Sequence, residues 1–404
     1  MQPALLVTTA VFIAGIVPAA AEGIGWRGDG TGIYQSAKPP TQWSGTQNIL
    51  WKTPLPGPSK GSPIVVGDSI FTLAYPYSLL CLNRADGKVL WQKTHACVDA
   101  VPGAEGARLD AEFPAKAIKD LYWPAGDDLS QTTPVSNGKA VYCVFGNGVV
   151  SAHAHDGARQ WMRFIERPAL KYGHATSPVL AGGFLIVHIN DLIALDPKTG
   201  REVWRAQLPA GHSTPVVARI GAADVIVHPS GALVQASDGK ILANELFKAD
   251  RGSPIVHGRK VYVHGVSSFV AIELPEDIAS APRKIWEAKA THGGYTIASP
   301  VLHDGRLYGA NRNGVLEVVD AANGANIFQE RLPLGNKYYS GIALAGGLLY
   351  LGTEKGTQMV IRPGARYDEV ASNELSELIN AAPVFADDRL YLRTEKHLVC
   401  IGNP

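Results

Sequence analysis

Eight side chains able to bind a polar ligand stand shortly before a dipeptide that the chain repeats, Ser/Thr-Pro or its equivalent. They are Lys60, Gln131, His174, His212, Arg251, Tyr295, Tyr339 and Asn380. The set is polar, aromatic and net basic, and its repeated position predicts a rim. Variable groups on a rigid scaffold are where ligand contacts are expected, although an ordinary solvated rim has a similar composition. Its basic character favours an acidic partner: a peptide, a glycan or an envelope protein.

Two further histidines, His153 and His155, have the spacing of metal ligands. Alternate residues of a strand share a face, which would bring both imidazoles together. In the repeat, however, His153 takes the turn position that Asp196 holds in the next copy, so we predict no metal site. The pair Asp127-Asp128 is interpreted as an exposed acidic turn. The sequence has no haem-attachment motif, phosphate loop or nucleophile elbow, and we predict no catalytic residue.

The scaffold that must position the rim is a repeat of roughly 40 residues. One copy runs from Ser62-Pro63 through three apolar strands to a turn at Asp86-Gly87 and then Trp91. The openings are Ser62-Pro63, Thr133-Pro134, Ser177-Pro178, Thr214-Pro215, Ser253-Pro254, Ser299-Pro300, Gly341-Ile342 and Ala382-Pro383. Four short strands per copy predict an all-β, eight-bladed β-propeller. The regularly spaced Trp residues are interpreted as packing between blades.

The two ends of the chain together complete one copy of the repeat. The last copy stops after its third strand, at Cys400-Ile401-Gly402. Near the start, Asn48 to Lys52 looks like a fourth strand without its blade, and it carries Trp51. Pairing this strand with the last three closes the ring and leaves no open sheet edge.

Composition and the first residues indicate an exported protein. Residues 4–17 are an apolar run too short to span a bilayer, and Ala19-Ala20-Ala21 is a small-residue cleavage site. We predict a signal peptide at 1–21, although no Lys or Arg precedes the run, and one propeller domain at 22–404. No Cys follows the run to anchor a lipid. The net charge of +1 argues against nucleic acid. The prediction is a periplasmic or secreted monomer that does not span the membrane.

One segment interrupts the repeat, an insertion at about 93–130 between blades 1 and 2. A loop this long is either functional or a cap. Helix-like spacing predicts a helix from Leu109 to Tyr122, and a second short helix is predicted at 369–378. Cys81 and Cys400 occupy the same core position in their repeats and are interpreted as free thiols. An exported chain would be able to oxidise Cys97 with Cys143, and the sequence leaves that pairing open.

The repeat resembles a known one. The run from Ala194 to Trp204, the opening Trp26 to Gly30 and the closing Leu390 to Gly402 are similar to a bacterial group of exported PQQ-like propellers. The resemblance covers almost the whole mature chain. The wider family includes quinoprotein alcohol dehydrogenases, which bind pyrroloquinoline quinone and Ca²⁺, and the outer-membrane protein assembly propeller, which binds partners without a cofactor.

The resemblance implies the fold more specifically than the function. No two Cys are adjacent here, and only one insertion is long, whereas quinoprotein alcohol dehydrogenases carry adjacent Cys and several long insertions. The anchoring Cys of the assembly lipoprotein is also missing. We therefore predict a non-catalytic binding or scaffold propeller of the cell envelope without a cofactor. The alternative is a reduced quinoprotein dehydrogenase that holds PQQ and Ca²⁺ at the same rim, where Asp250 is the nearest acid.

Overall fold

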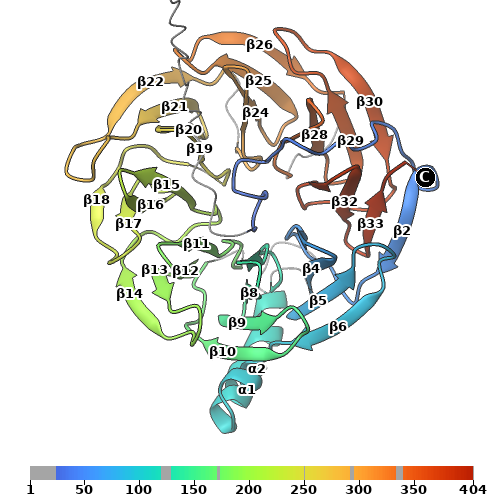
Figure 1. Ribbon diagram of the computed structural model, residues 1–404, viewed down its shortest axis with the longest axis vertical. Helices are drawn as coiled ribbons and strands as arrows, with labels where there is room; N and C mark the ends of the chain where they lie inside the picture. Colours follow the sequence, from blue (N-terminus) through green and yellow to red (C-terminus); the bar gives the residue numbers. More distant parts are fainter. Residues whose placement is uncertain are drawn as a thin grey trace, which may run out of the picture.

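The computed structural model describes residues 24–119, 129–170, 173–249, 251–291, 295–333 and 340–403. Eight sheets surround a central axis like the blades of a propeller (Figure 1). In seven of them four strands follow chain order through antiparallel pairs, so each of these blades is one sequence repeat. The predicted eight-bladed, all-β architecture is confirmed. The predicted signal peptide at 1–21 lies outside the described residues.

The strands of the first four blades run in chain order. Blade 1 contains β3 (Ile64–Val66), β4 (Ser69–Ala74), β5 (Ser78–Asn83) and β6 (Val89–Thr94), and blade 2 contains β7 (Val135–Ser136), β8 (Ala140–Val144), β9 (Val149–Ala154) and β10 (Arg159–Phe164). Blade 3 contains β11 (Val179–Ala181), β12 (Phe184–His188), β13 (Leu192–Leu195) and β14 (Glu202–Ala206), and blade 4 contains β15 (Val216–Ile220), β16 (Ala223–Val227), β17 (Leu233–Gln235) and β18 (Ile241–Ala243).

The other four blades complete the ring. Blade 5 contains β19 (Ile255–His257), β20 (Lys260–His264), β21 (Ser268–Glu273) and β22 (Arg283–Lys289), and blade 6 contains β23 (Val301–His303), β24 (Arg306–Ala310), β25 (Val315–Asp320) and β26 (Asn326–Arg331). Blade 7 contains β27 (Ala343–Ala345), β28 (Leu348–Gly352), β29 (Thr357–Ile361) and β30 (Glu369–Glu374), and blade 8 contains β31 (Val384–Ala386), β32 (Arg389–Arg393), β33 (His397–Ile401) and β2 (Ile49–Pro54).

Blade 8 closes the ring as predicted. Strand β2 pairs antiparallel with β33, and Trp51 lies opposite Cys400. The outer position of the last sheet is therefore filled by the start of the domain, and both ends of the ring are held by backbone hydrogen bonds.

The tryptophans join each blade to the next one. In all eight sheets the register shifts between the third and fourth strands, beside the repeat Trp or its replacement. Such a bulge re-aims a side chain. Trp204 Nε1, for example, donates to the Ala236 carbonyl of blade 4 at 3.0 Å. A methyl group added at Gly239 would lie 2.6 Å from that ring, and Gly239 has φ +74°. The ring and the turn glycine thus require each other, which confirms the packing interpretation.

The repeated Ser/Thr openings form a hydrogen-bonded circuit around the axis. The Ser62 N–H donates to Thr133 Oγ1 at 3.0 Å, and the Thr133 N–H donates to Ser177 Oγ at 3.0 Å. The same link continues through Thr214, Ser253 and Ser299. Each hydroxyl satisfies a backbone donor of the preceding blade, a group that is costly to bury without a partner. The requirement explains why these openings carry Ser or Thr.

The circuit is interrupted where the openings lack a hydroxyl, at Gly341 and Ala382. There the N-terminal segment enters the axis, visible as the dark blue trace across the centre of Figure 1. Arg27 is 2% exposed, and its Nη2 donates to the carbonyls of Pro300 (2.9 Å) and Ile342 (2.5 Å). Nearby, β1 (Ile33–Tyr34) pairs parallel with β27. We call residues 24–38 the N-terminal strap. It closes the end of the axis at which the first strands finish.

The insertion folds against the outside of blades 1 and 2. It forms α1 (Cys97–Ala100) and α2 (Ala104–Lys119), so the predicted helix exists but begins before Leu109, and residues 120–128 lie outside the described ones. The second predicted helix, at 369–378, is wrong. Residues 369–374 form β30, because blade 7 needs a fourth strand and Val360 pairs with Ala371 there.

All four cysteines are buried and free, which confirms the interpretation of Cys81 and Cys400 and leaves Cys97 and Cys143 unpaired with each other. Cys143 contacts other side chains instead. Its Sγ lies 3.1 Å from Ser151 Oγ and 3.7 Å from His95 Nε2. Within the described part of the chain, no helix combines the length and apolar character needed to cross a membrane.

Candidate functional site

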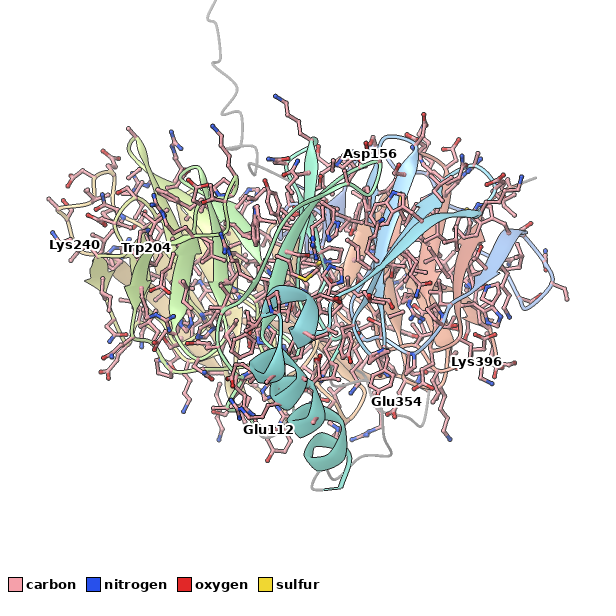
Figure 2. The ribbon with its side chains drawn as sticks, turned by 90° about the horizontal axis from the view of Figure 1, so that it is seen from below. Glu112, Asp156, Trp204, Lys240, Glu354 and Lys396 are labelled. Atoms are coloured by element: carbon pink, nitrogen blue, oxygen red, sulfur yellow. The ribbon has the colours of Figure 1, made fainter. Side chains whose placement is uncertain are left out.

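The predicted rim residues gather on one face of the ring, where the first strands begin. Loops such as those at Glu354 and Lys396 mark this face in Figure 2, and the turns at Asp156 and Lys240 mark the opposite one. We call the group Lys60, Gln131, His174, His212, Arg251, Tyr295 and Asn380 the mouth. Of its members, His174 is fully buried and Tyr295 is 55% exposed. Tyr339, the eighth predicted rim residue, lies outside the described residues.

Charges from different blades meet at the mouth. Burial lowers the pKa of His212, and the positive charges of Arg251 and Lys60 lower it further. The three groups precede blades 4, 5 and 1, so they act on one another only because the ring is closed. The Arg251 guanidinium also lies 5.4 Å from the centre of the Tyr295 ring, a cation–π contact. The arrangement favours an anionic ligand with some apolar or aromatic surface.

A row of buried histidines lies behind the mouth between blades 3 and 4. The Ser230 N–H donates to His228 Nδ1 (3.1 Å), and His228 Nε2 lies 3.2 Å from His188 Nδ1. Burial lowers the pKa of His228 to about 3 and that of His188 to about 4, so both rings are neutral at pH 7. Because His228 Nδ1 accepts from the Ser230 N–H, the proton of this neutral ring is on Nε2. The His228 Nε2–H therefore donates to His188 Nδ1. His188 then carries its proton on Nε2, and a backbone contact with Leu208 raises its pKa against the larger effect of burial.

His174 extends this row toward the mouth. Burial lowers its pKa to about 3, and His188 and His212 lower it further, while a backbone contact with Thr176 acts in the opposite direction. The row therefore supplies neutral donors and acceptors, while Lys60 and Arg251 supply the charge. Sequence reasoning found His174 and missed His188 and His228. The sequence did contain a signal for these residues. His188, His228 and His264 occupy the same repeat position, at or directly after the end of the second strand, in three successive blades.

The donor set of the mouth does not fit a Ca²⁺ and quinone site. Calcium takes about six to eight oxygen ligands, several of them carboxylates. The nearby acids have other partners: Glu166 pairs with Arg205 (2.6 Å), and Glu377 pairs with Lys52 (2.5 Å). Asp250 lies outside the described residues. Among the residues that are described, no group of three or more His, Cys, Asp or Glu is arranged to hold a metal ion.

The two histidines with metal-like spacing point to different partners. His153 Nε2 lies 3.0 Å from His95 Nε2, whereas His155 Nε2 lies 3.1 Å from Ser136 Oγ. They therefore share no ligand position. The strand register aligns His153 with Leu195, so the expected correspondence with the turn residue Asp196 is wrong.

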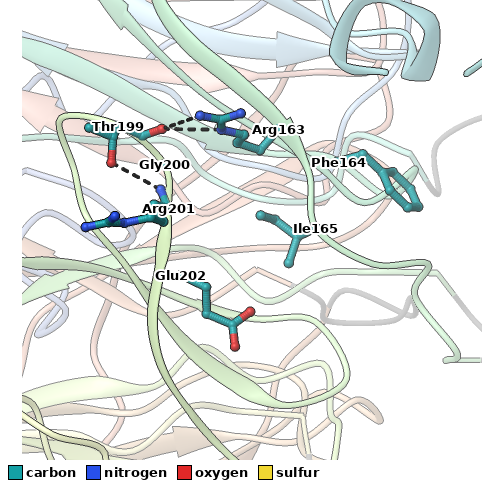
Figure 3. Close-up of a pocket in the computed structure, with 7 residues that line it drawn as sticks. All are labelled: Arg163, Phe164, Ile165, Thr199, Gly200, Arg201 and Glu202. Carbon is teal, nitrogen blue, oxygen red and sulfur yellow. Dashed lines mark hydrogen bonds between the residues drawn. The ribbon is translucent and has the colours of Figure 1, made fainter. Parts of the chain in front are cut away.

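Two hollows lie on the outside of the ring, away from the mouth. One, of about 580 Å³, lies between blades 2 and 3 (Figure 3) and is lined by Arg163, Phe164, Ile165, Thr199, Gly200, Arg201 and Glu202. Arg163 is held there by the Thr199 carbonyl, at 3.3 Å from both Nε and Nη2. The other, of about 530 Å³, is the equivalent groove between blades 1 and 2. Sequence reasoning predicted neither, because each is formed by two repeats.

A family model described as "Outer membrane protein assembly factor BamB" matches residues 41–111 and 96–276, which is more than half of the chain. Among curated proteins, tetrathionate hydrolase of Acidithiobacillus ferrooxidans is 25% identical over 238 residues, covering 54% of this chain and 44% of that protein. The chain thus matches less than half the length of this relative.

Solved structures share the fold at low sequence identity. BamB from Moraxella catarrhalis superposes with a TM-score of 0.61 at 12% identity, covering 87% of this chain and 97% of that one. Quinohemoprotein alcohol dehydrogenase ADHIIG from Pseudomonas putida HK5 gives a TM-score of 0.61 at 12% identity, covering 91% and 78%. An outer membrane protein assembly factor and an alcohol dehydrogenase fit equally well, so the fold does not decide between their functions.

Proposed function

The chain belongs to the family of the outer membrane protein assembly factor BamB, and from that membership we propose that it is a binding protein of the cell envelope. In this proposal it is exported, holds an acidic peptide, glycan or protein at the mouth and catalyses no reaction. The predicted signal peptide supports the location.

The observation that carries the proposal is the convergence of Lys60, His212 and Arg251. Lys60 and Arg251 both place positive charge near one imidazole, and a locally positive potential attracts an anion. The cation–π contact places an aromatic surface, Tyr295, beside Arg251. The quinoprotein alternative lacks this support, because the mouth offers cations where the metal needs carboxylates.

A second candidate is action on an anionic sulfur compound. The relative named tetrathionate hydrolase favours it, and a cationic mouth suits such an anion. The measurement is loss of tetrathionate when it is incubated with the purified protein. Turnover that disappears in Arg251→Ala would replace the non-catalytic proposal.

The binding proposal is tested with a labelled hexaglutamate peptide and with capture of envelope proteins on immobilised protein. The double variant His212→Ala/Arg251→Ala is compared with the control His257→Ala/Lys240→Ala, which changes an exposed His and Lys on the opposite face. We expect the first to weaken peptide binding about tenfold, or about 1.4 kcal/mol, and the control to bind normally. Binding should also fall with salt, because exposed charges are screened over about 8 Å at physiological ionic strength. Equal capture by both doubles at all salt concentrations would refute the mouth as the binding surface.

A further inference from the structure

Main-chain hydrogen bonds hold two segments of the mouth side by side. The N–H groups of Arg251 and Gly252 both donate to the Thr296 carbonyl, at 3.1 and 2.9 Å. Thr296 is buried, and its Oγ1 donates to the Gly265 carbonyl at 2.8 Å. Tyr295, the residue before Thr296, therefore lies next to Arg251 on a fixed backbone.

Tyr295 presents its ring to the Arg251 guanidinium. Its own carbonyl accepts from the Arg312 N–H at 2.9 Å, in the turn after β24, so the backbone of Tyr295 is held on both sides. The guanidinium carbon lies over the ring, 5.4 Å from its centre. A cation–π contact uses the charge of the guanidinium and the face of the ring, whereas the five N–H groups point outward in the guanidinium plane. Arg251 thus keeps its ability to donate hydrogen bonds while the ring limits its orientation.

The two cations of the mouth differ in what they can recognise. Lys60 and Arg251 both place positive charge near His212. An ammonium is a point charge on a flexible stem, whereas a guanidinium presents parallel N–H donors that match both oxygens of one carboxylate. A guanidinium whose orientation is already limited loses less conformational freedom when it binds. Of these two cations, the one beside Tyr295 is therefore better suited to select a carboxylate.

We propose that Arg251 selects the ligand of the mouth by binding one carboxylate through two parallel N–H···O bonds, and that Tyr295 holds its guanidinium in place for this contact. This role rests on the proposed function, because it names the group by which an acidic peptide is recognised, the carboxylate of an Asp or Glu side chain. Tyr295 is a positioning residue that acts through Arg251. The charge of Lys60 speeds the approach of the peptide without selecting the carboxylate.

The first test changes each cation into the other type and measures binding of the labelled hexaglutamate peptide by fluorescence anisotropy. Arg251→Lys keeps the charge and removes the paired donors, so we expect it to bind about fivefold more weakly than the wild type. Arg251→Ala, which also removes the charge, should bind more weakly still. Lys60→Arg is the matched control, because it makes the reverse exchange at the cation that does not select, and it should bind within about twofold of the wild type.

The second test is a double-mutant cycle at Tyr295. Tyr295→Phe keeps the ring and should bind as the wild type does, whereas Tyr295→Leu should weaken binding about threefold. In the Arg251→Lys protein, Tyr295→Leu should have little further effect, because the role of the ring depends on the guanidinium. A ring that only stabilised the fold would weaken both proteins equally. Tyr295 is exposed, so we expect these variants to fold, and circular dichroism checks this.

Three outcomes separate this role from the proposed function. Equal binding by Arg251→Lys and the wild type, with weaker binding by Arg251→Ala, means that the mouth recognises charge alone, which overturns the role of Arg251 and leaves the proposed function intact. An equal loss from Tyr295→Leu in the two proteins overturns the positioning role. A wild type that does not bind the peptide at any concentration up to about 1 mM overturns the proposed function and this role with it.

Discussion

Mild acid should unfold this protein, because its interior holds many neutral histidines. Burial lowers the pKa of six imidazoles to about 3 or 4: His95, His153, His174, His188, His228 and His264. Above about pH 6.5 these groups are neutral in both the folded and the unfolded chain, so they do not affect stability. As the pH falls from about 6.5 toward 4, the unfolded chain binds protons that the folded chain does not, and the folded state loses stability.

The size of the effect follows from these shifts. Each histidine lowers the free energy of unfolding by about 1.4 kcal/mol per pH unit in this window, or about 2 kcal/mol at pH 5. Six such groups together rival the roughly 5–15 kcal/mol that stabilises a typical domain. The pH range in which the histidines reduce stability lies above the range in which the carboxylates do so. Glu377, whose pKa is lowered to about 2 by Lys52, Thr394 and His397 despite burial, loses its contribution only below about pH 4.5.

Urea unfolding followed by tryptophan fluorescence measures this loss between pH 7.5 and 5. We expect the unfolding midpoint to fall steeply below pH 6.5. His264 is stacked on Phe269 with 4.1 Å between ring centres, and His264→Gln should reduce the slope by about 1.4 kcal/mol per pH unit. His257→Gln, at an exposed position, should leave it unchanged. A midpoint that stays constant from pH 7.5 to 5 would refute the reasoning.

Three further predictions concern the ring closure, the packing between blades and the binding of PQQ. Deleting residues 22–53 removes β2 and exposes the edge of β33, so we expect aggregation on size exclusion, and a soluble monomer of unchanged melting temperature would contradict the closure argument. Trp204→Ala removes the bond to Ala236 and empties the space over Gly239, at a cost of about 3–5 kcal/mol in urea unfolding, with no separate loss of ligand binding. Absorbance titration with PQQ and Ca²⁺ should show no saturable binding at micromolar concentrations, and dye-linked alcohol oxidation on reconstitution would favour the quinoprotein alternative.

The sequence predicted the ring because its signals are local. A Ser/Thr-Pro opening, a Gly turn and a Trp recur within each repeat, and the missing strand at one end matched the extra strand at the other. The error at 369–378 has the same origin. In blade 7, Tyr367 stands where the repeat has its turn Gly and Ala371 replaces the Trp, so nothing local marked β30, and only pairing with β29 makes it a strand.

Only those site residues were predicted that share a single position in the repeat. The mouth residues Lys60, His212 and Arg251 share a place in the repeat, so the register found them. The bond between His188 and His228 joins two blades, and the groove between blades 1 and 2 also includes Asp99 of the insertion. Such contacts depend on how twisted sheets pack side by side, which no single repeat contains.

The closure of blade 8 also sets an order of events during synthesis. Strand β2 is made before any complete blade and pairs with β33, the last strand to be made. Until that strand emerges, β2 carries Trp51 without its partner strand. Each inner blade, in contrast, completes its sheet from neighbouring sequence. The pairing of β2 with β33 has the greatest sequence separation within any blade. We therefore expect closing of the ring to be the slow step of folding, and the unjoined ring to be the form most exposed to wrong partners.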